Sequence, residues 1–181
     1  MARWAVVTGH KGDKKAEFVL GVAKALEAAG LRVAGFVQRR WHDGDQKGHD
    51  LERVATGERL RLSQDGVAAK SISQDAFCTY AFENDGFARA FEWLREDGRA
   101  ADVLVLDDVS KLETQGKGHA AALTWALAQA DKLVVISARA SQLFYVVENF
   151  GLQDDPIAAA ELPVGEDGLS EFAREIARAL R

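Results

Sequence analysis

The most constraining feature of this sequence is its N-terminal succession of a strand, a glycine-containing loop, a helix and a second strand. Arg3–Thr8 is a short apolar run rich in β-formers, which predicts a buried strand ending at Gly9. Lys14–Ala29 repeats apolar residues at helical spacing, and Gly30 after it is typical of a helix C-terminus. Leu31–Gln38 is a second apolar, β-rich run. This order predicts a βαβ unit with parallel strands.

The rest of the chain continues the alternation of strands and helices. Strands are predicted at 102–108, 132–137 and 157–162, and helices at 84–97, 118–130, 141–149 and 169–180. Residues 39–63 are polar and contain the turn Thr56-Gly57, which predicts a small antiparallel hairpin insertion. The 65–80 stretch is less regular, with room for one more short strand. We therefore predict one α/β domain, residues 1–181, with a mainly parallel sheet between two helical layers.

Composition and charge narrow the classes of function. The formal net charge is −5 and the sequence pI is about 5.4, which argues against general nucleic-acid binding. No apolar run reaches the ~20 residues that a membrane-spanning helix needs. Cys78 is the single cysteine, so the chain forms no internal disulfide. These features predict a cytoplasmic protein that binds neither nucleic acid nor membranes.

The loop between the first strand and the first helix resembles a phosphate-binding loop. Backbone N–H groups in such a loop, together with the start of a helix, bind phosphate oxygens. The standard pattern is G-x-x-x-x-G-K-[ST]. The residues at these positions, all predicted to contact nucleotide, are Gly9, His10, Lys11, Gly12, Asp13, Lys14, Lys15 and Ala16.

Two of these residues depart from the pattern. Lys14 replaces the second glycine, and a non-glycine residue forced to positive φ costs roughly 1–2 kcal/mol. Ala16 replaces the hydroxyl residue that contacts Mg²⁺, so it offers no metal ligand. Lys15 retains the lysine expected to reach the β- and γ-phosphates. The alternative interpretation is an ordinary strand-to-helix turn with exposed lysines.

Acidic residues at the end of the third predicted strand supply the second motif. Val103–Leu106 is apolar and leads into Asp107 and Asp108. In nucleotide hydrolases the first acid of such a pair holds Mg²⁺ and the next orients the attacking water. A solvated strand end is the alternative. Residues 111–118 follow as a charged loop, either simply exposed or facing a ligand at the carboxyl edge of the sheet.

Together these segments resemble the THEP-type nucleoside triphosphatases and an allied uncharacterised bacterial branch in which the phosphate loop is eroded. The matching runs are the loop 9–15, Ala34-Gly35-Phe36, Gly48-His49-Asp50-Leu51, Ala55-Thr56-Gly57-Glu58-Arg59, Ile72-Ser73-Gln74 and Asp107-Asp108-Val109-Ser110-Lys111-Leu112-Glu113. The resemblance covers about residues 3–137. It implies a P-loop fold and slow, Mg²⁺-dependent hydrolysis of ATP, GTP and other nucleoside triphosphates.

The resemblance also implies individual roles. It assigns phosphate contact to Gly9, Gly12 and Lys15, Mg²⁺ coordination to Asp107 and direction of the attacking water to Asp108. Lys15 and Asp108 are therefore the predicted catalytic residues. The family has a longer glutamate in place of Asp108, so Asp108 reaches less far.

Three functions follow from this reading. The first is a weak nucleoside triphosphatase, and the second is an inactive, degenerate P-loop domain that binds a nucleotide, an anion or a protein as a regulator. A kinase-like phosphotransferase ranks last, because no acceptor pocket is visible in the sequence.

The remaining polar and aromatic residues are expected to have structural roles. The histidines, His10, His42, His49 and His119, lack the spacing of a helical metal site and are expected at the surface or in loops. His10 alone lies within the loop. Arg139 follows a predicted strand and is expected at the surface, with contact to a γ-phosphate as the alternative. Trp41 is expected to pack the insertion onto the sheet rather than to stack on a base.

Overall fold

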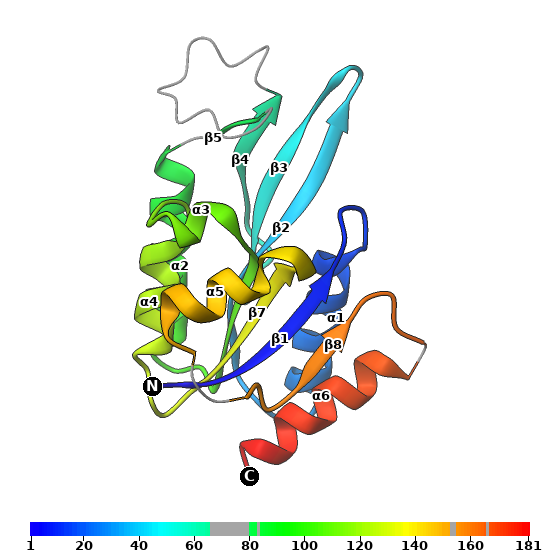
Figure 1. Ribbon diagram of the computed structural model, residues 1–181, viewed down its shortest axis with the longest axis vertical. Coiled ribbons are helices and arrows are strands. Elements are labelled where there is room, and N and C mark those ends of the chain that lie inside the picture. The colour runs from blue at the N-terminus through cyan, green and yellow to red at the C-terminus, as the bar shows by residue number, and fades with distance from the viewer. Residues whose placement is uncertain (66–79, 83, 153–154, 166) are drawn as a thin grey trace.

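The computed structural model describes residues 1–65, 80–82, 84–152, 155–165 and 167–181 (Figure 1). Cys78 and the resemblance segment Ile72-Ser73-Gln74 lie outside these ranges. In the part of the chain that is described, no helix has the length and apolarity needed to cross a membrane.

Within the described residues, eight strands form one mixed sheet in the order β5-β4-β3-β2-β6-β7-β1-β8. Strands β2, β6, β7, β1 and β8 are parallel neighbours, whereas β3, β4 and β5 are added antiparallel at one side. The bounds are β1 Arg3–Gly9, β2 Val33–Asp43, β3 Gln46–Arg53, β4 Arg59–Asp65, β5 Tyr80–Phe82, β6 Val103–Val109, β7 Leu133–Arg139 and β8 Ala159–Glu161.

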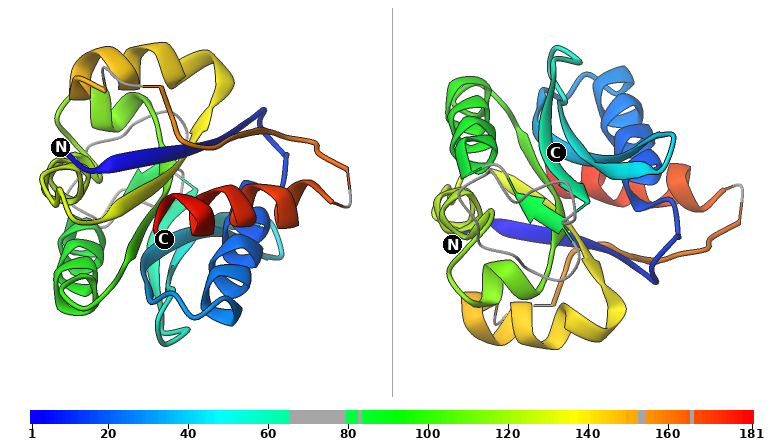
Figure 2. Two further views of the ribbon diagram at one scale, coloured as in Figure 1. Left: turned by 90° about the horizontal axis from the view of Figure 1, so that it is seen from below. Right: turned by 90° about the horizontal axis from the view of Figure 1, so that it is seen from above.

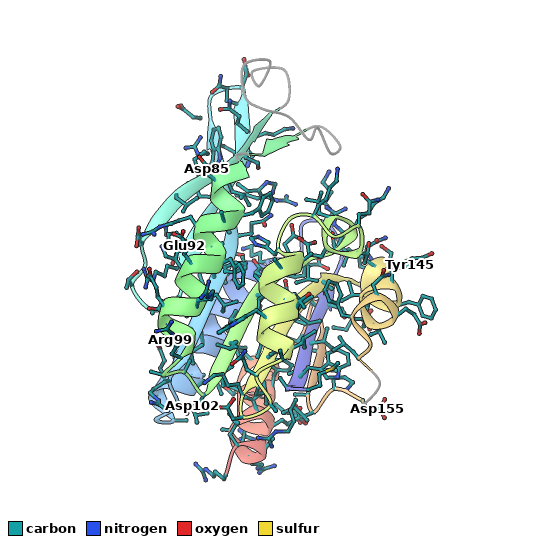
Figure 3. The ribbon with its side chains drawn as sticks, turned by 90° about the vertical axis from the view of Figure 1, so that its left-hand side faces the viewer. Asp85, Glu92, Arg99, Asp102, Tyr145 and Asp155 are labelled. Carbon is teal, nitrogen blue, oxygen red and sulfur yellow. The ribbon has the colours of Figure 1, made fainter. Side chains whose placement is uncertain are left out.

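Helices cover both faces of the sheet (Figure 2). One face carries α1 (Lys15–Ala28) and α6 (Gly168–Ala179), which pack on each other through Phe18 and Phe172. The other carries α2 (Asn84–Gly98), α4 (Ala120–Leu127) and α5 (Leu143–Phe150). Figure 3 shows α2 running past Asp85 and Glu92, and Tyr145 extending outward from α5. The predicted three-layer α/β architecture is confirmed.

Coverage on both faces explains the unbroken apolar runs that identified the central strands. All residues of β6 except Asp108 are buried, and β1 and β7 each expose one residue only. A strand covered on both faces needs no polar side, so it reads as a continuous hydrophobic run. The helices therefore enclose two cores, one on each side of the same sheet.

The antiparallel part is longer than the sequence indicated. β2 does not end at Gln38 but continues to Asp43, turns at Gly44 (φ 55°) and returns as β3. The turn at Thr56-Gly57 joins β3 to β4, as predicted. The outer half of β2 is half-buried or exposed, so it carries no apolar pattern and reads as a polar loop. Trp41 lies in this part, with the Arg61 guanidinium 3.6 Å from its ring centroid.

Strand register brings the ends of four strands together. Gly9 of β1 is level with Arg139 of β7, and Leu106 of β6 is level with Phe36 of β2. Because these strands are parallel, their carboxyl ends meet at one edge of the sheet. Asp107 and Asp108 follow Leu106 at this edge.

Candidate functional site

A cavity of about 400 Å³ lies at the carboxyl edge of the parallel strands. This volume is within the range of small-molecule sites. It is lined by Lys11, Gly12, Asp13, Lys14, Lys15, Ala16, Glu17, Gln38, Arg39, Arg40, His49, Phe87, Asp107, Asp108, Ser110, Lys111, Leu112, Glu113, Arg139 and Gln142. The cavity thus brings together the predicted loop, both predicted acids and part of the hairpin insertion. Gly9 and His10 are not among its lining residues.

The loop adopts a strand-to-helix turn without strain at Lys14. Gly12 takes the positive backbone angle, with φ 102°, and nothing lies where a side chain would start. Lys14 has φ −63° and directly precedes α1. The predicted cost of placing a non-glycine residue there is therefore wrong, because this turn needs positive φ at Gly12 instead.

Loop polar groups bond to one another. The Asp13 carboxylate accepts the His10 backbone N–H at 2.5 Å, and Lys15 Nζ donates to the His10 carbonyl at 3.1 Å. Ala16 packs against the core beneath α1 and offers no polar atom. The side chains of Lys11 and Lys14 are exposed. The loop is therefore held in a defined shape by its own residues.

Asp107 is buried at the end of β6 and has two donors. Its Oδ2 accepts the Gln38 backbone N–H at 2.9 Å, and its Oδ1 accepts the Ser137 hydroxyl. Burial raises the pKa of Asp107 to about 6, and the nearby charge of Asp108 adds to the rise. The two hydrogen bonds and the charge of Lys15 oppose it. Asp107 is accordingly mostly ionised at neutral pH and faces the cavity.

Asp108 has an unusual backbone conformation. Its φ is 59°, the left-handed region, and the register of β6 against β7 shifts between Leu106 and Val109. Ser137 Oγ accepts the Asp108 backbone N–H at 2.9 Å, and Gln38 Nε2 donates to its Oδ2 at 2.9 Å. A register shift of this kind is a β-bulge, which redirects a side chain. Backbone strain such as the left-handed φ of Asp108 is concentrated at functional sites. Here it places two consecutive acids on one cavity.

The segment predicted as a charged loop is organised around one buried carboxylate. Residues Lys111–Thr114 form the short helix α3, which begins with a capping box between Ser110 and Glu113. Glu113 is 3% exposed and accepts the backbone N–H groups of Ser110 and His119, each at 2.8 Å. Burial raises the pKa of Glu113 to about 7. Glu113 therefore joins the starts of α3 and α4 beside the cavity.

His119 lies in the turn before α4, but its ring is not at the surface. It is 1% exposed, and the rings of Phe36 and Phe87 lie 4.3 and 4.8 Å away between centroids. Nε2 lies 3.4 Å from Gln38 Oε1, while Nδ1 has no hydrogen-bond partner within the described chain. Burial lowers the pKa of His119 to about 3, so the ring is neutral.

The surface expectation is therefore wrong for His119, whose apolar environment comes from elements distant in sequence. His10 and His42 are exposed, and His49 is half-buried on the cavity wall. His49 Nδ1 lies 2.9 Å from Ser63 Oγ, and burial lowers the pKa of this ring. Across the residues described, no cluster of three or more histidine, cysteine or acidic side chains is arranged to hold a metal ion by itself.

Cationic side chains from several segments surround the cavity. Arg40 from the hairpin and Arg139 from the end of β7 are both exposed and line it, together with loop lysines. Besides burial, the charges of both arginines lower the pKa of His49. Within the described ranges neither forms a salt bridge with a carboxylate, whereas Arg39 pairs with Glu52 at 3.4 Å. The cavity therefore suits an anionic ligand.

The sequence did not point to Gln38, Arg40 or Ser137 as residues of the site. Each has an ordinary residue type at an unremarkable position, and only the packing of neighbouring strands brings it to the site. Gln38 and Ser137 bond to the acids of β6 from the two neighbouring strands. One feature of the sequence could have indicated Gln38 and Ser137: each is the last residue of a predicted parallel strand, and the carboxyl ends of these strands meet.

The parallel sheet, the loop leading from β1 into α1 and the acids ending β6 define a P-loop NTPase-like fold. Two solved structures share it over their full length. A human cancer-related nucleoside triphosphatase has a TM-score of 0.72 and 20% identity, covering 99% of this chain and 98% of its own. THEP1 from the hyperthermophile Aquifex aeolicus has a TM-score of 0.68 and 17% identity, covering 98% and 99%.

By sequence, the chain belongs to the DUF2478 family, described as a protein of unknown function, whose model matches residues 4–144. The match extends from β1 into the start of α5 and includes every segment that lines the cavity. A search of curated proteins finds no match. The predicted relation to nucleoside triphosphatases is thus supported at the level of the fold, and the eroded-loop branch stays a prediction.

Proposed function

We propose that this chain binds a nucleoside triphosphate, ATP or GTP, in the cavity at the carboxyl edge of the sheet. The observation that carries the proposal is the convergence of loop residues 11–16 with cationic side chains from β2 and β7 on one cavity. The two structural neighbours support it, since one is described as a nucleoside triphosphatase and both share the fold.

The phosphates are proposed to lie over the loop. Gly9 and Gly12 allow close approach of backbone N–H groups, and the start of α1 adds positive potential. Lys15 Nζ is proposed to leave the His10 carbonyl and reach the β- and γ-phosphates. His10, Lys11, Asp13, Lys14 and Ala16 complete the proposed nucleotide-contacting set.

The arginines are proposed to hold the outer phosphates. A triphosphate carries several negative charges, which favours cationic partners in addition to the loop lysines. Arg40 and Arg139 come from other elements and have no carboxylate partner in the described parts of the chain. Guanidinium groups bind phosphate oxygens in a bidentate manner, so these side chains fit the distal end of such a ligand.

The donor set at the end of β6 fits Mg²⁺ carried by a nucleotide. Mg²⁺ is usually bound by one or two carboxylates together with substrate phosphates and water. Asp107 and Asp108 are adjacent on the cavity, and a carboxylate oxygen that accepts one hydrogen bond keeps lone-pair capacity for a metal ion. They would hold the ion, with Asp107 as the main ligand. When bound, Mg²⁺ would neutralise charge that develops on the phosphates.

Weak hydrolysis is the proposed activity. Asp108, directed into the cavity by its left-handed backbone, is proposed to orient the attacking water. Lys15 is proposed to stabilise charge on the transferred phosphoryl group. Slow turnover is expected because Ala16 offers no hydroxyl for the metal and Asp108 is a short acid.

An inactive nucleotide-binding regulator is the second candidate. The observation favouring it is that both Asp107 oxygens already accept hydrogen bonds from Gln38 and Ser137, while Ala16 packs on the core. In that case the cationic cavity binds nucleotide without turnover, and Mg²⁺ adds little to affinity.

Calorimetric titration with ATP, with and without Mg²⁺, tests binding, and phosphate release tests hydrolysis. Lys15→Ala is expected to weaken binding at least about tenfold. Lys24→Ala is the matched control, because Lys24 is an exposed lysine of the same helix outside the cavity. Asp107→Asn is expected to abolish any phosphate release. Absence of ATP binding, or equal binding by Lys15→Ala and wild type, would overturn the proposal.

A further inference from the structure

A carboxylate of the chain itself lies within the loop proposed to bind phosphate. Asp13 Oδ2 is 2.5 Å from the backbone nitrogen of His10, the first N–H after β1. It also lies close to Gly9, where a side-chain carbon built on the glycine would be 2.9 Å from the same oxygen. An acidic oxygen is therefore held against the backbone of the loop by a short hydrogen bond.

This arrangement engages groups that a phosphate ligand needs. Backbone N–H groups of a strand-to-helix loop are the donors that bind phosphate oxygens, and Asp13 already takes the one from His10. The expected phosphate-binding ammonium of Lys15 is also engaged, by the carbonyl of the same His10. The loop is thus closed on itself, with an anion where another anion is expected.

We propose that Asp13 is an internal anion that occupies the phosphate loop and has to be displaced when ligand binds. The inference rests on the proposed function and identifies the residue that limits the affinity of the site. A ligand phosphate and the Asp13 carboxylate have charges of the same sign, so both do not occupy the loop at once without repulsion. A ligand must therefore bring several negative charges, which favours a polyphosphate chain over a single phosphate.

A purely structural role for Asp13 makes the opposite prediction. Aspartate side chains often bond to nearby backbone N–H groups and so stabilise turns. If Asp13 only shaped the loop, its removal would loosen the site and weaken binding. Asparagine keeps the size and an acceptor oxygen but lacks the charge, and alanine lacks both, so the two substitutions separate charge from shape.

The experiment is calorimetric titration of the full chain with inorganic tripolyphosphate and, separately, with ATP. Wild type, Asp13→Asn, Asp13→Ala and Glu17→Gln are compared, and thermal unfolding verifies that each variant is folded. Glu17→Gln is the matched control, because it removes one negative charge from the same cavity without touching the loop hydrogen bonds. We expect both Asp13 variants to bind tripolyphosphate at least about tenfold more tightly than wild type, and Glu17→Gln to gain much less.

The outcomes separate this inference from the proposed function. Binding by wild type with equal or weaker binding by Asp13→Asn overturns the internal-anion role alone. An equal gain in Glu17→Gln also overturns it, because the effect would then be general charge. Absence of binding by every protein overturns the proposed function and this inference with it. Binding by the Asp13 variants but not by wild type supports both.

Discussion

Ser137 offers a direct test of how the two acids are held, because one hydroxyl serves both. Its Oγ donates to Asp107 Oδ1 and accepts the Asp108 backbone N–H at 2.9 Å, and the residue is fully buried. A hydrogen bond to a charged group contributes about 1.5–3 kcal/mol, and a buried N–H left unpaired costs about 1–3 kcal/mol. We expect Ser137→Ala to lower the free energy of unfolding by about 3 kcal/mol at pH 8.5.

The pH dependence of this loss identifies its cause. The folded pKa of Asp107, about 6, exceeds its ordinary value of 3.8, so its ionisation lowers stability as pH rises between these values. Ser137 stabilises the ionised form, and its removal is expected to raise the folded pKa by about 1–2. At low pH Asp107 is protonated, and the loss of the Ser137 hydrogen bond then costs little stability. The destabilisation should therefore grow by about 1.5 kcal/mol from pH 6 to pH 8.5.

Urea unfolding at the two pH values, in the presence of a chelator, measures the effect. Ser63→Ala is the matched control: its buried hydroxyl accepts the His49 backbone N–H at 3.1 Å and lies 2.9 Å from Nδ1 of that ring. Burial lowers the pKa of His49 and so favours its neutral ring, and the loss is therefore expected to change less with pH than in Ser137→Ala. A loss in Ser137→Ala that is equal at pH 6 and pH 8.5 would refute the assigned ionic hydrogen bond.

Three further predictions concern the strands, α3 and the cavity. Gly35→Ala should lower the free energy of unfolding by more than about 3 kcal/mol, because φ is 127° and the new side-chain carbon overlaps the backbone of β6. Gly30→Ala, where the new carbon meets open space, should cost about 1–2 kcal/mol. Equal losses in thermal unfolding would contradict this prediction. Glu113→Gln should remove a pH dependence of about 3 kcal/mol in the free energy of unfolding, because a carboxyl whose pKa rises from 4.5 to about 7 on folding lowers stability as pH rises between those values. If wild type and Glu113→Gln lose the same stability between pH 5 and pH 8 in denaturant unfolding, the prediction is excluded. Arg40→Gln with Arg139→Gln should weaken ATP binding about tenfold at low salt and less at high salt, and salt-independent calorimetric affinities would argue against a charge role.

The order of elements and the parallel core were readable from the sequence because they depend on local patterns. Apolar runs such as 103–106 and 133–136 mark strands covered on both faces, and helical spacing in 15–28 marks α1. The outer part of the hairpin was not readable as strand. It lies beyond the helical layers, so β2 past Gln38 has no apolar face to reveal it.

The candidate site divides in the same way. Gly9–Ala16 and Asp107-Asp108 were found from the sequence, because strand-end glycines, lysines and acids form local motifs. The burial of Glu113 and His119 and the hydrogen bonds of Gln38 and Ser137 were not, because each depends on a partner from another element. The motif also predicted the backbone of the loop wrongly, because it placed positive φ at Lys14 and the structure has it at Gly12.

The sequence by itself determined that this chain forms an α/β fold with a lysine-containing loop after β1 and two acids near the end of β6. Both are consequences of residue type and spacing along a single stretch of chain. Only the tertiary structure decided what those residues meet. Parallel register places the ends of β1, β2, β6 and β7 at one edge. There Ser137 and Gln38 bind the acids, arginines gather around the cavity, and Asp13 folds back onto the loop, because contacts between distant segments exist only once the sheet has formed.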